Sequence, residues 1–255
     1  MLAAINFPPI GEVLNWRSIA FGSGAFELNK VGLITLTAAL ITLVVFAIAG
    51  RQGRLVPRGV QNLVEIGVDF ITNSIVRESM GPQGLVWVPW LTGLFFFILI
   101  SNLFEVIPFI QMPATARIGV TAPLALMVYV VFIGVGIRSQ GLGKYLKSSL
   151  VPSGVPVAIL PLLIPLELLS TFIVRPFALA IRLFGNLLAG HLLLIAFAVL
   201  TEALFVKSIL LVADPLPFAM LVVLTGYEIF VSFLQAFIFT TLAAVYIGEA
   251  MAGEH

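Results

Sequence analysis

The stretch LITLTAALITLVVFAIAG at residues 33–50 contains no charged side chain over a length that can cross a bilayer. A helix of about 20 residues spans the ~30 Å hydrocarbon core. Further runs without Asp, Glu, Lys or Arg occupy 79–104, 118–137, 148–166, 183–201 and 229–248. They lack the short alternating strands of a membrane barrel, and lipid forces backbone groups to pair within a helix. The sequence therefore predicts an all-α integral membrane protein.

The composition supports this class. Of 255 residues, 60% are hydrophobic and 10% are charged, whereas a soluble domain carries about 25% charged residues. A net charge of +1 offers no concentrated basic face for nucleic acid. The absence of Cys excludes a disulfide framework, a thiolate metal site and a Cys nucleophile. No nucleotide-binding glycine loop is present, so we expect no phosphoryl chemistry in this chain, and no cofactor is expected.

Basic loops set the predicted topology. The first span, at about 31–49, is followed by RQGRLVPR at 51–58, and the positive-inside rule places this loop in the cytoplasm. Residues 1–30 are then an external N-terminal segment without the basic leader of a cleaved signal. Residues 59–80 mix charged and apolar side chains, which is typical of an amphipathic helix at the membrane interface.

Two further spans, at about 86–109 and 118–137, are predicted to form a hairpin. The second span leads to the bases Arg138, Lys144 and Lys147, which mark another cytoplasmic loop. No internal repeat or soluble domain is visible, so residues 1–255 form a single membrane domain with about five membrane helices. The N-terminus is expected outside and the C-terminus in the cytoplasm.

The last two apolar segments are too long for upright spans and hold several ionisable groups. They cover about 156–206 and 215–248, and helices of this length must tilt strongly or lie partly in the membrane plane. Their polar members within the apolar sequence are Glu167, Arg175, Arg182, His191, Glu228 and Gln235. A charge at the bilayer centre costs about 2.5–3.5 kcal/mol on insertion scales, so these residues need partners, water or a function.

Arg182 stands in ALAIRLFGNLLAGHLL, residues 178–193. Its guanidinium cannot lose its proton, so it can act as a fixed positive barrier but not as a proton relay. Asn186 lies one turn further on the same face, and Gly190 is among the small residues that permit close helix approach. Two interpretations remain open: an internal acid neutralises Arg182 for assembly, or its carboxylate partner belongs to another, moving subunit.

His191 and Glu228 can both take up and release protons within a membrane, and we interpret them as a functional pair. Gln235 lies about two turns beyond Glu228 on the same stripe. A structural role for His191 is the alternative, since a lone buried histidine is commonly a satisfied core residue. Metal binding is not expected, because no second ligand stands at a suitable spacing. Glu105 fits either the outer approach to this pair or a place near the membrane interface.

Two motifs resemble subunit a of F-type ATP synthases. They are RLFGNLLAGH at 182–191 and YEIFVSFLQAFIFTTLAAVYIGEA at 227–250, and the resemblance extends over nearly the whole chain, including SNLFEVIP at 101–108. It implies that Arg182 is the essential arginine. It also implies an outer half-channel of Asn186, His191, Glu228 and Gln235, and an inner half-channel at Glu167 with Arg175 in support. In some members of the family the two positions hold Glu and His, whereas here they are exchanged as His191 and Glu228.

The resemblance further implies a proton-translocating stator subunit that is not itself an enzyme. Residues 156–248 would form a tilted helical hairpin facing a c-ring of small hairpin subunits, and the expected partners include peripheral-stalk b-type subunits and the remaining synthase subunits. A bacterial plasma membrane is the expected location, with a mitochondrial inner membrane as the alternative. Two rival functions are a secondary proton-coupled transporter and a passive anchor subunit. The first expects repeats, and a haem-binding anchor expects a second inward His, whereas only His191 lies in a span.

Overall fold

The computed structural model describes residues 30–52, 56–107, 110, 112, 114–151, 159–205 and 215–252, without the side chains of 52, 200–205 and 215–218. Residues 1–29 of the predicted external segment, the start of the predicted hairpin at 156–158, and 206–214 lie outside this part. All regular elements within it are helical. Five helices are long and apolar enough to cross a membrane: Lys30–Arg51, Pro82–Leu103, Ile118–Gln140, Leu160–Val199 and Ala219–Ala252. The predicted all-α membrane fold is confirmed.

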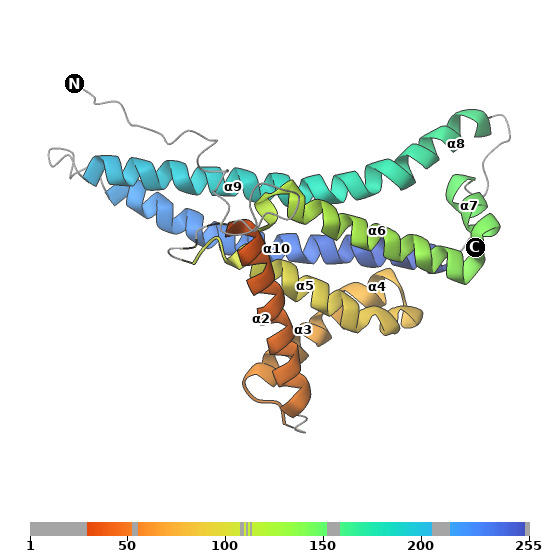
Figure 1. The fold of residues 1–255 in the computed structure, drawn as a ribbon, viewed down its shortest axis with the longest axis horizontal. Helices are drawn as coiled ribbons and strands as arrows, with labels where there is room; N and C mark the ends of the chain where they lie inside the picture. The colour runs from red at the N-terminus through yellow and green to blue at the C-terminus, as the bar shows by residue number, and fades with distance from the viewer. Residues whose placement is uncertain are drawn as a thin grey trace.

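Two very long helices dominate the molecule and lie side by side along its long axis (Figure 1). One is continuous from α8 (Leu160–Leu169) through a π-helical turn (Ser170–Val174) into α9 (Arg175–Phe205). The other is α10 (Pro215–Ala252), whose 38 residues make a helix about 57 Å long. Because this length far exceeds the ~30 Å apolar core of a bilayer, α10 cannot stand upright in it.

A proline accounts for the π-helical turn. Pro176 has no N–H to give to the preceding turn, and its ring clashes with the carbonyl four residues earlier. The backbone accommodates both effects by widening at Ser170–Val174. As a result, the chain bends where α8 meets α9 (Figure 1).

Helix α10 is the central element of the packing. It contacts α9, α5 (Val88–Leu103) and α6 (Ile118–Gln140), whereas α5 and α6 make little direct contact. The predicted hairpin of 86–109 and 118–137 is therefore wrong as a packed pair. The reason is the face of α10: Ala236, Ala243 and Ala244 are fully buried, and such small side chains let helices approach α10 closely.

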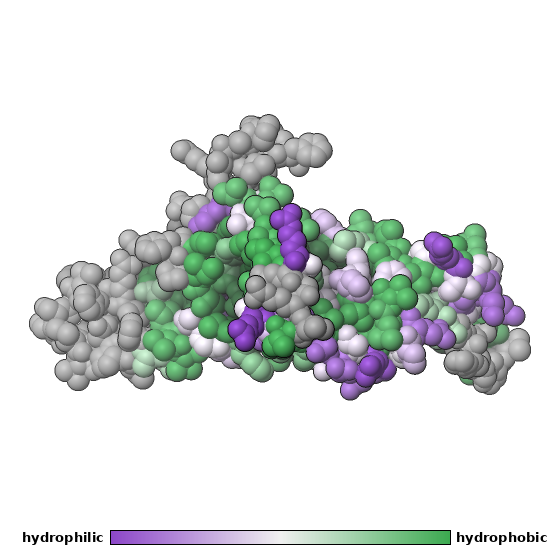
Figure 2. Space-filling model, turned by 90° about the horizontal axis from the view of Figure 1, so that it is seen from below, coloured by the Kyte–Doolittle hydropathy of each residue, from purple (hydrophilic) through white to green (hydrophobic). Residues whose placement is uncertain are grey.

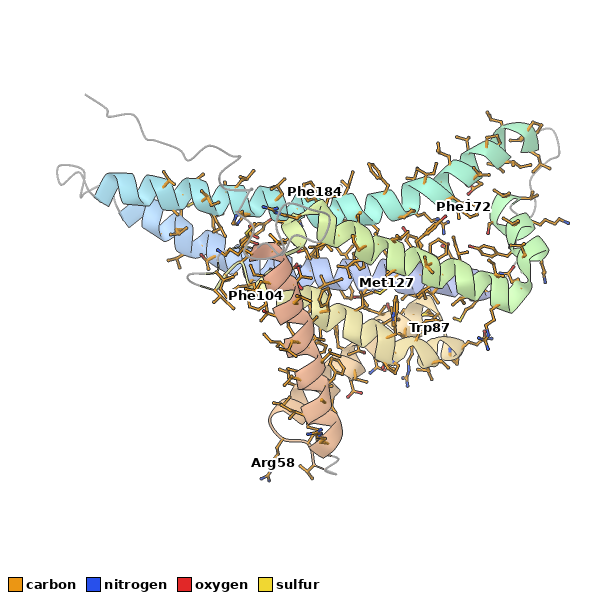
Figure 3. All side chains as sticks on the ribbon, viewed as in Figure 1. Arg58, Trp87, Phe104, Met127, Phe172 and Phe184 are labelled. Carbon is orange, nitrogen blue, oxygen red and sulfur yellow. The ribbon has the colours of Figure 1, made fainter. Side chains whose placement is uncertain are left out.

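The predicted amphipathic helix at 59–80 is present as α3 (Val60–Ile71), a π-helical turn (Thr72–Val76) and α4 (Arg77–Ser79). Its face with Val64, Ile71 and Ile75 is buried, and α3 packs on α2 (Lys30–Gln52) and α5. Arg58 at the α2–α3 turn points away from the bundle, while Phe104 lies near the start of α2 (Figure 3). The interfacial location of this helix remains a prediction.

The second basic loop contains α7 (Leu142–Leu150). The Tyr145 ring is buried against Gly136 of α6, where a Cβ atom would collide with it. Hydrophobic side chains cover much of the face seen in Figure 2, and hydrophilic residues are more frequent toward the end of the molecule that holds α7.

Candidate functional site: two polar regions along α9 and α10

Three titratable side chains from separate parts of the chain meet in the interior. Glu105 follows α5, His191 lies on α9 and Glu228 on α10, and their exposed fractions are 2%, 6% and 1%. His191 Nδ1 lies 3.4 Å from Glu105 Oε1. The Glu228 carboxyl rests against the backbone of Gly190, where a Cβ atom would overlap it. We call Glu105, Gly190, His191 and Glu228 the His191 cluster.

The predicted functional pair of His191 and Glu228 lies within this one cluster, and the ion-pair partner of His191 is Glu105. Successive residues on a helix point about 100° apart, so Gly190 faces α10 while His191 faces the turn after α5. Glu228 occupies the space that the missing side chain of Gly190 leaves. The structure thus places Glu105 beside His191, inside the cluster.

Burial governs the electrostatics of Glu105. Removal from water raises the pKa of the Glu105 carboxyl, and the contact with His191 opposes that rise. The Glu105 and Glu228 carboxyls are also close enough for their charges to interact. A histidine in contact with a buried carboxyl can exchange a proton with it, as His191 can with Glu105.

The Asn186 and Gln235 side chains connect the two long helices. Asn186 Nδ2 on α9 donates a hydrogen bond to Gln235 Oε1 on α10 at 3.3 Å. Both residues were candidates from the sequence, and the structure brings them together. Arg182, one turn before Asn186, is exposed on the surface of α9. Its neighbours Phe177 and Ile181 are exposed as well, so the guanidinium stands on an apolar surface.

Buried polar atoms without a protein hydrogen-bond partner extend from the His191 cluster along α10. Within the described residues they include Glu105 Oε2, Glu228 Oε2, Ser101 Oγ, Ser232 Oγ, Gln235 Nε2 and Thr240 Oγ1. Such groups are costly to bury unless water or another polar group reaches them. This row of atoms is therefore suited to a hydrated path between α5, α9 and α10.

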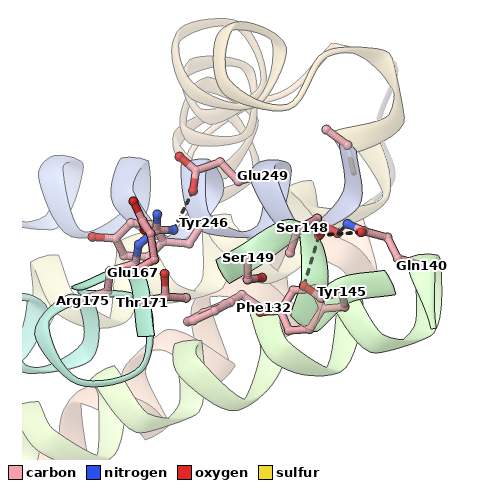
Figure 4. A pocket seen from close by; sticks show the side chains of 12 residues that line it. Phe132, Gln140, Tyr145, Ser148, Ser149, Glu167, Thr171, Arg175, Tyr246 and Glu249 are labelled. Atoms are coloured by element: carbon pink, nitrogen blue, oxygen red, sulfur yellow. Dashed lines mark hydrogen bonds and ion pairs between the residues drawn. The ribbon is translucent and has the colours of Figure 1, made fainter. Parts of the chain in front are cut away.

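A second polar region lies near the other end of α10. It is a cavity of about 430 Å³ lined by residues from α6 to α10, among them Tyr145, Glu167, Thr171, Arg175, Tyr246 and Glu249 (Figure 4). Arg175 Nη1 lies 2.6 Å from Glu249 Oε2, and the guanidinium carbon is 5.1 Å from the centre of the Tyr246 ring. We call this space the Glu167 cavity.

Glu249 and its ion pair with Arg175 were not predicted from the sequence. The only signal for Glu249 is its place directly after the charge-free run 229–248, where an acid is normally interpreted as an ordinary charge at the end of a span. Its partner lies 74 residues away in the sequence. Only the packing of α9 on α10 brings the two together.

The His191 cluster and the Glu167 cavity are far apart, with Arg182 between them. At 1.5 Å per residue, Glu167 and His191 are separated by about 36 Å along α8 and α9. Glu228 and Glu249 are separated by about 31 Å along α10. In the part of the chain that the structure describes, no group of three His, Asp or Glu side chains could hold a metal ion.

Comparison with known proteins identifies the family. The sequence model of the family described as "ATP synthase A chain" matches residues 32–248. The chain is 45% identical to ATP synthase subunit a of Frankia alni, over 94% of this chain and 84% of that protein. It is 42% identical to that of Rhodococcus erythropolis (98% and 89% covered) and 36% identical to that of Hyphomonas neptunium (98% of each). These matches over nearly the whole length show that the chain belongs to the ATP synthase A chain family.

Proposed function

We propose that this chain is the proton-channel and stator subunit in the membrane sector of an F-type ATP synthase, with two offset half-channels that meet a rotating c-ring. Family membership makes it a non-catalytic, multi-pass membrane subunit of the synthase. The observation that carries the finer proposal is the exposed guanidinium of Arg182 midway between two separate polar regions.

In this proposal the outer half-channel is built from Asn186, His191, Glu228 and Gln235, and Glu105 joins it through its contact with His191. A proton entering from outside passes along these groups and their water to a ring carboxylate. The neutral carboxylic acid can then enter lipid, because it no longer bears the cost of a buried charge. Each proton that crosses 100 mV releases about 2.3 kcal/mol, which drives rotation.

The inner half-channel is the Glu167 cavity. After nearly a full turn, the ring carboxylic acid reaches this region and gives its proton to Glu167 or to cavity water, and its charge is restored. Arg182 attracts the returning carboxylate on the α9 surface. Because the guanidinium keeps its proton at any ordinary pH, Arg182 also denies protons a direct path between the half-channels.

The partners follow from the same assignment. The hairpin of 156–248 faces the c-ring, and the other surfaces meet peripheral-stalk b-type subunits, the remaining synthase subunits and lipid. The similar proteins come from bacteria, which supports a bacterial plasma membrane as the location. The basic loops at 51–58 and 138–147 orient the N-terminus outward and the C-terminus toward the cytoplasm. A secondary transporter, with Arg182 binding an anionic substrate, finds no support in the family match.

The test is Arg182→Ala in the complete synthase. ATP-driven proton pumping into inverted membrane vesicles should be abolished while the complex remains assembled, since Arg182 is exposed and its loss leaves no buried cavity. Arg58→Ala, at an exposed arginine that points away from the bundle, is the matched control and should pump normally (Figure 3). Unimpaired pumping by assembled Arg182→Ala complexes would overturn the mechanism.

A further inference from the structure

The Glu167 cavity holds one cation and two carboxylates. Arg175 is flanked by Glu167, about two turns earlier on the same chain segment, and by Glu249 of α10. Only Glu249 binds it: the Arg175 Nη1 to Glu249 Oε2 distance is 2.6 Å, and within the described residues Glu167 has neither a hydrogen bond nor an ion pair. Figure 4 shows Arg175 turned toward Glu249, with Glu167 beside it.

Helix α10 offers Arg175 a binding place with two contacts. Tyr246 and Glu249 are three residues apart on α10 and therefore lie on one face. The guanidinium stands 5.1 Å from the Tyr246 ring centre while it pairs with Glu249. A cation over an aromatic face gains a further attraction, which fixes the side chain in this rotamer. The direction of Arg175 is thus set by α10 and not by its own helix.

Stability alone does not explain this ion pair. The Arg175 and Glu249 side chains keep 29% and 53% of their exposure, and ion pairs this accessible contribute little to folding. Without Glu249, however, the nearest carboxylate for Arg175 in the cavity would be Glu167. A carboxylate bound by a guanidinium loses proton affinity by about tenfold or more.

We infer that Glu249 is a positioning residue for proton release: it holds Arg175 against Tyr246 and thereby leaves the Glu167 carboxylate unpaired to accept protons. This inference rests on the proposed function. In the transfer step, the O–H bond of the ring carboxylic acid breaks as an O–H bond forms on Glu167. The ring keeps a carboxylate, and Glu167 then passes the proton to water on the cytoplasmic side. During ATP-driven pumping the same steps run in reverse.

Proton exchange at Glu167 depends on every ionisable group around it. Those lining the cavity come from four elements and are Tyr145 of α7, Glu167 of α8, Arg175 of α9, and Tyr246 and Glu249 of α10. Arg175 is the only cation among the cavity-lining residues that the structure describes. If Glu249 is neutralised, Glu167 is therefore the one carboxylate among these lining residues that can pair with the charge of Arg175.

The experiment measures ATP-driven proton pumping per assembled synthase in inverted vesicles. Glu249→Gln should pump about tenfold more slowly than wild type, and its rate should recover as the cytoplasmic-side pH is lowered by about one unit. Adding Arg175→Gln to it should raise pumping several-fold, because the competing cation is gone. Glu249→Asp keeps the charge and should lose far less. Glu78→Gln, at an exposed glutamate on α4, is the matched control.

The outcomes separate a positioning role from a structural one. Wild-type pumping by Glu249→Gln overturns the inference. It is also overturned if the double variant is as slow as Glu249→Gln, because the pair would then act as a mere clamp between helices. A loss of pumping rate in Glu249→Gln that no pH change relieves also overturns the inference. Failure of the proposed function has a different signature, namely normal pumping by Arg182→Ala.

Discussion

Gly190→Ala tests the geometry of the His191 cluster through a single added methyl group. The new Cβ atom would lie 2.6 Å from Glu228 Cδ and 2.7 Å from Glu228 Oε2, whereas ordinary van der Waals contact begins at 3.4 Å. The carboxyl must therefore move by roughly 1 Å, and displacements of this size at a reacting group are costly. Helix α9 itself favours the change, since alanine exceeds glycine in helix propensity by about 1 kcal/mol.

The expected magnitude follows from the overlap. Forcing an extra carbon into a packed interior costs about 1–3 kcal/mol. If this cost falls on the proton-transfer geometry, proton flow decreases by a factor of about 5 to about 150. The gain in helix propensity offsets part of the packing cost, so we expect the complex to assemble. Gly190→Ala should thus separate function from stability.

The assay is ATP-driven quenching of a pH-sensitive dye in inverted vesicles, normalised to the amount of assembled complex. Gly134→Ala is the matched control, because Gly134 lies inside helix α6 and a Cβ atom there meets nothing within 4 Å. The control should pump at the wild-type rate. Equal pumping by Gly190→Ala and Gly134→Ala would refute the placement of the Glu228 carboxyl against Gly190.

Three further outcomes are expected. Burial raises the pKa of Glu105, so the wild type loses stability as pH rises through that raised value. Glu105→Gln lacks this titration, so its melting temperature minus that of the wild type should grow with pH. A difference that stays constant with pH contradicts this. His191→Glu sets a carboxyl against Glu105, so its synthase should pump protons more slowly than that of His191→Gln. If adding Glu105→Gln to His191→Glu restores no pumping, the contact between His191 and Glu105 carries no function. Gln235→Leu removes the acceptor of the Asn186 amide hydrogen bond. It should lower proton pumping several-fold, at a stability cost of about 0.5–1.5 kcal/mol. Unchanged pumping would exclude Gln235 from the proton path.

The membrane helices could be predicted from sequence because lipid imposes a length on charge-free runs. The run 31–50 lies within one helix, and the two over-long C-terminal segments are the long helices of the structure. The pairing of 86–109 with 118–137 was wrong for a physical reason. Neighbours in sequence usually pack together, but here the small residues of α10 allow it to lie between them.

The site residues could be predicted from sequence where an ionisable side chain stands inside an otherwise apolar membrane span. Arg182, His191 and Glu228 stand out because ionisable groups are rare in lipid. Their partners are less predictable: Glu105 precedes His191 by many turns and loops, and Glu249 resembles an ordinary end-of-span charge. Only tertiary packing determines which carboxyl meets which cation.

Access from opposite sides of the membrane is the most direct test of two half-channels separated by Arg182. The chain contains no Cys, so single thiols can be introduced at Thr171, which lines the Glu167 cavity, and at Ser232, which lies on the row of buried polar atoms. Silver ions are applied to either face of vesicles while proton flow is measured, with the unsubstituted chain as control. Thr171→Cys should be inhibited only from the cytoplasmic face, and Ser232→Cys only from the outer face. Inhibition of both from the same face would contradict the account.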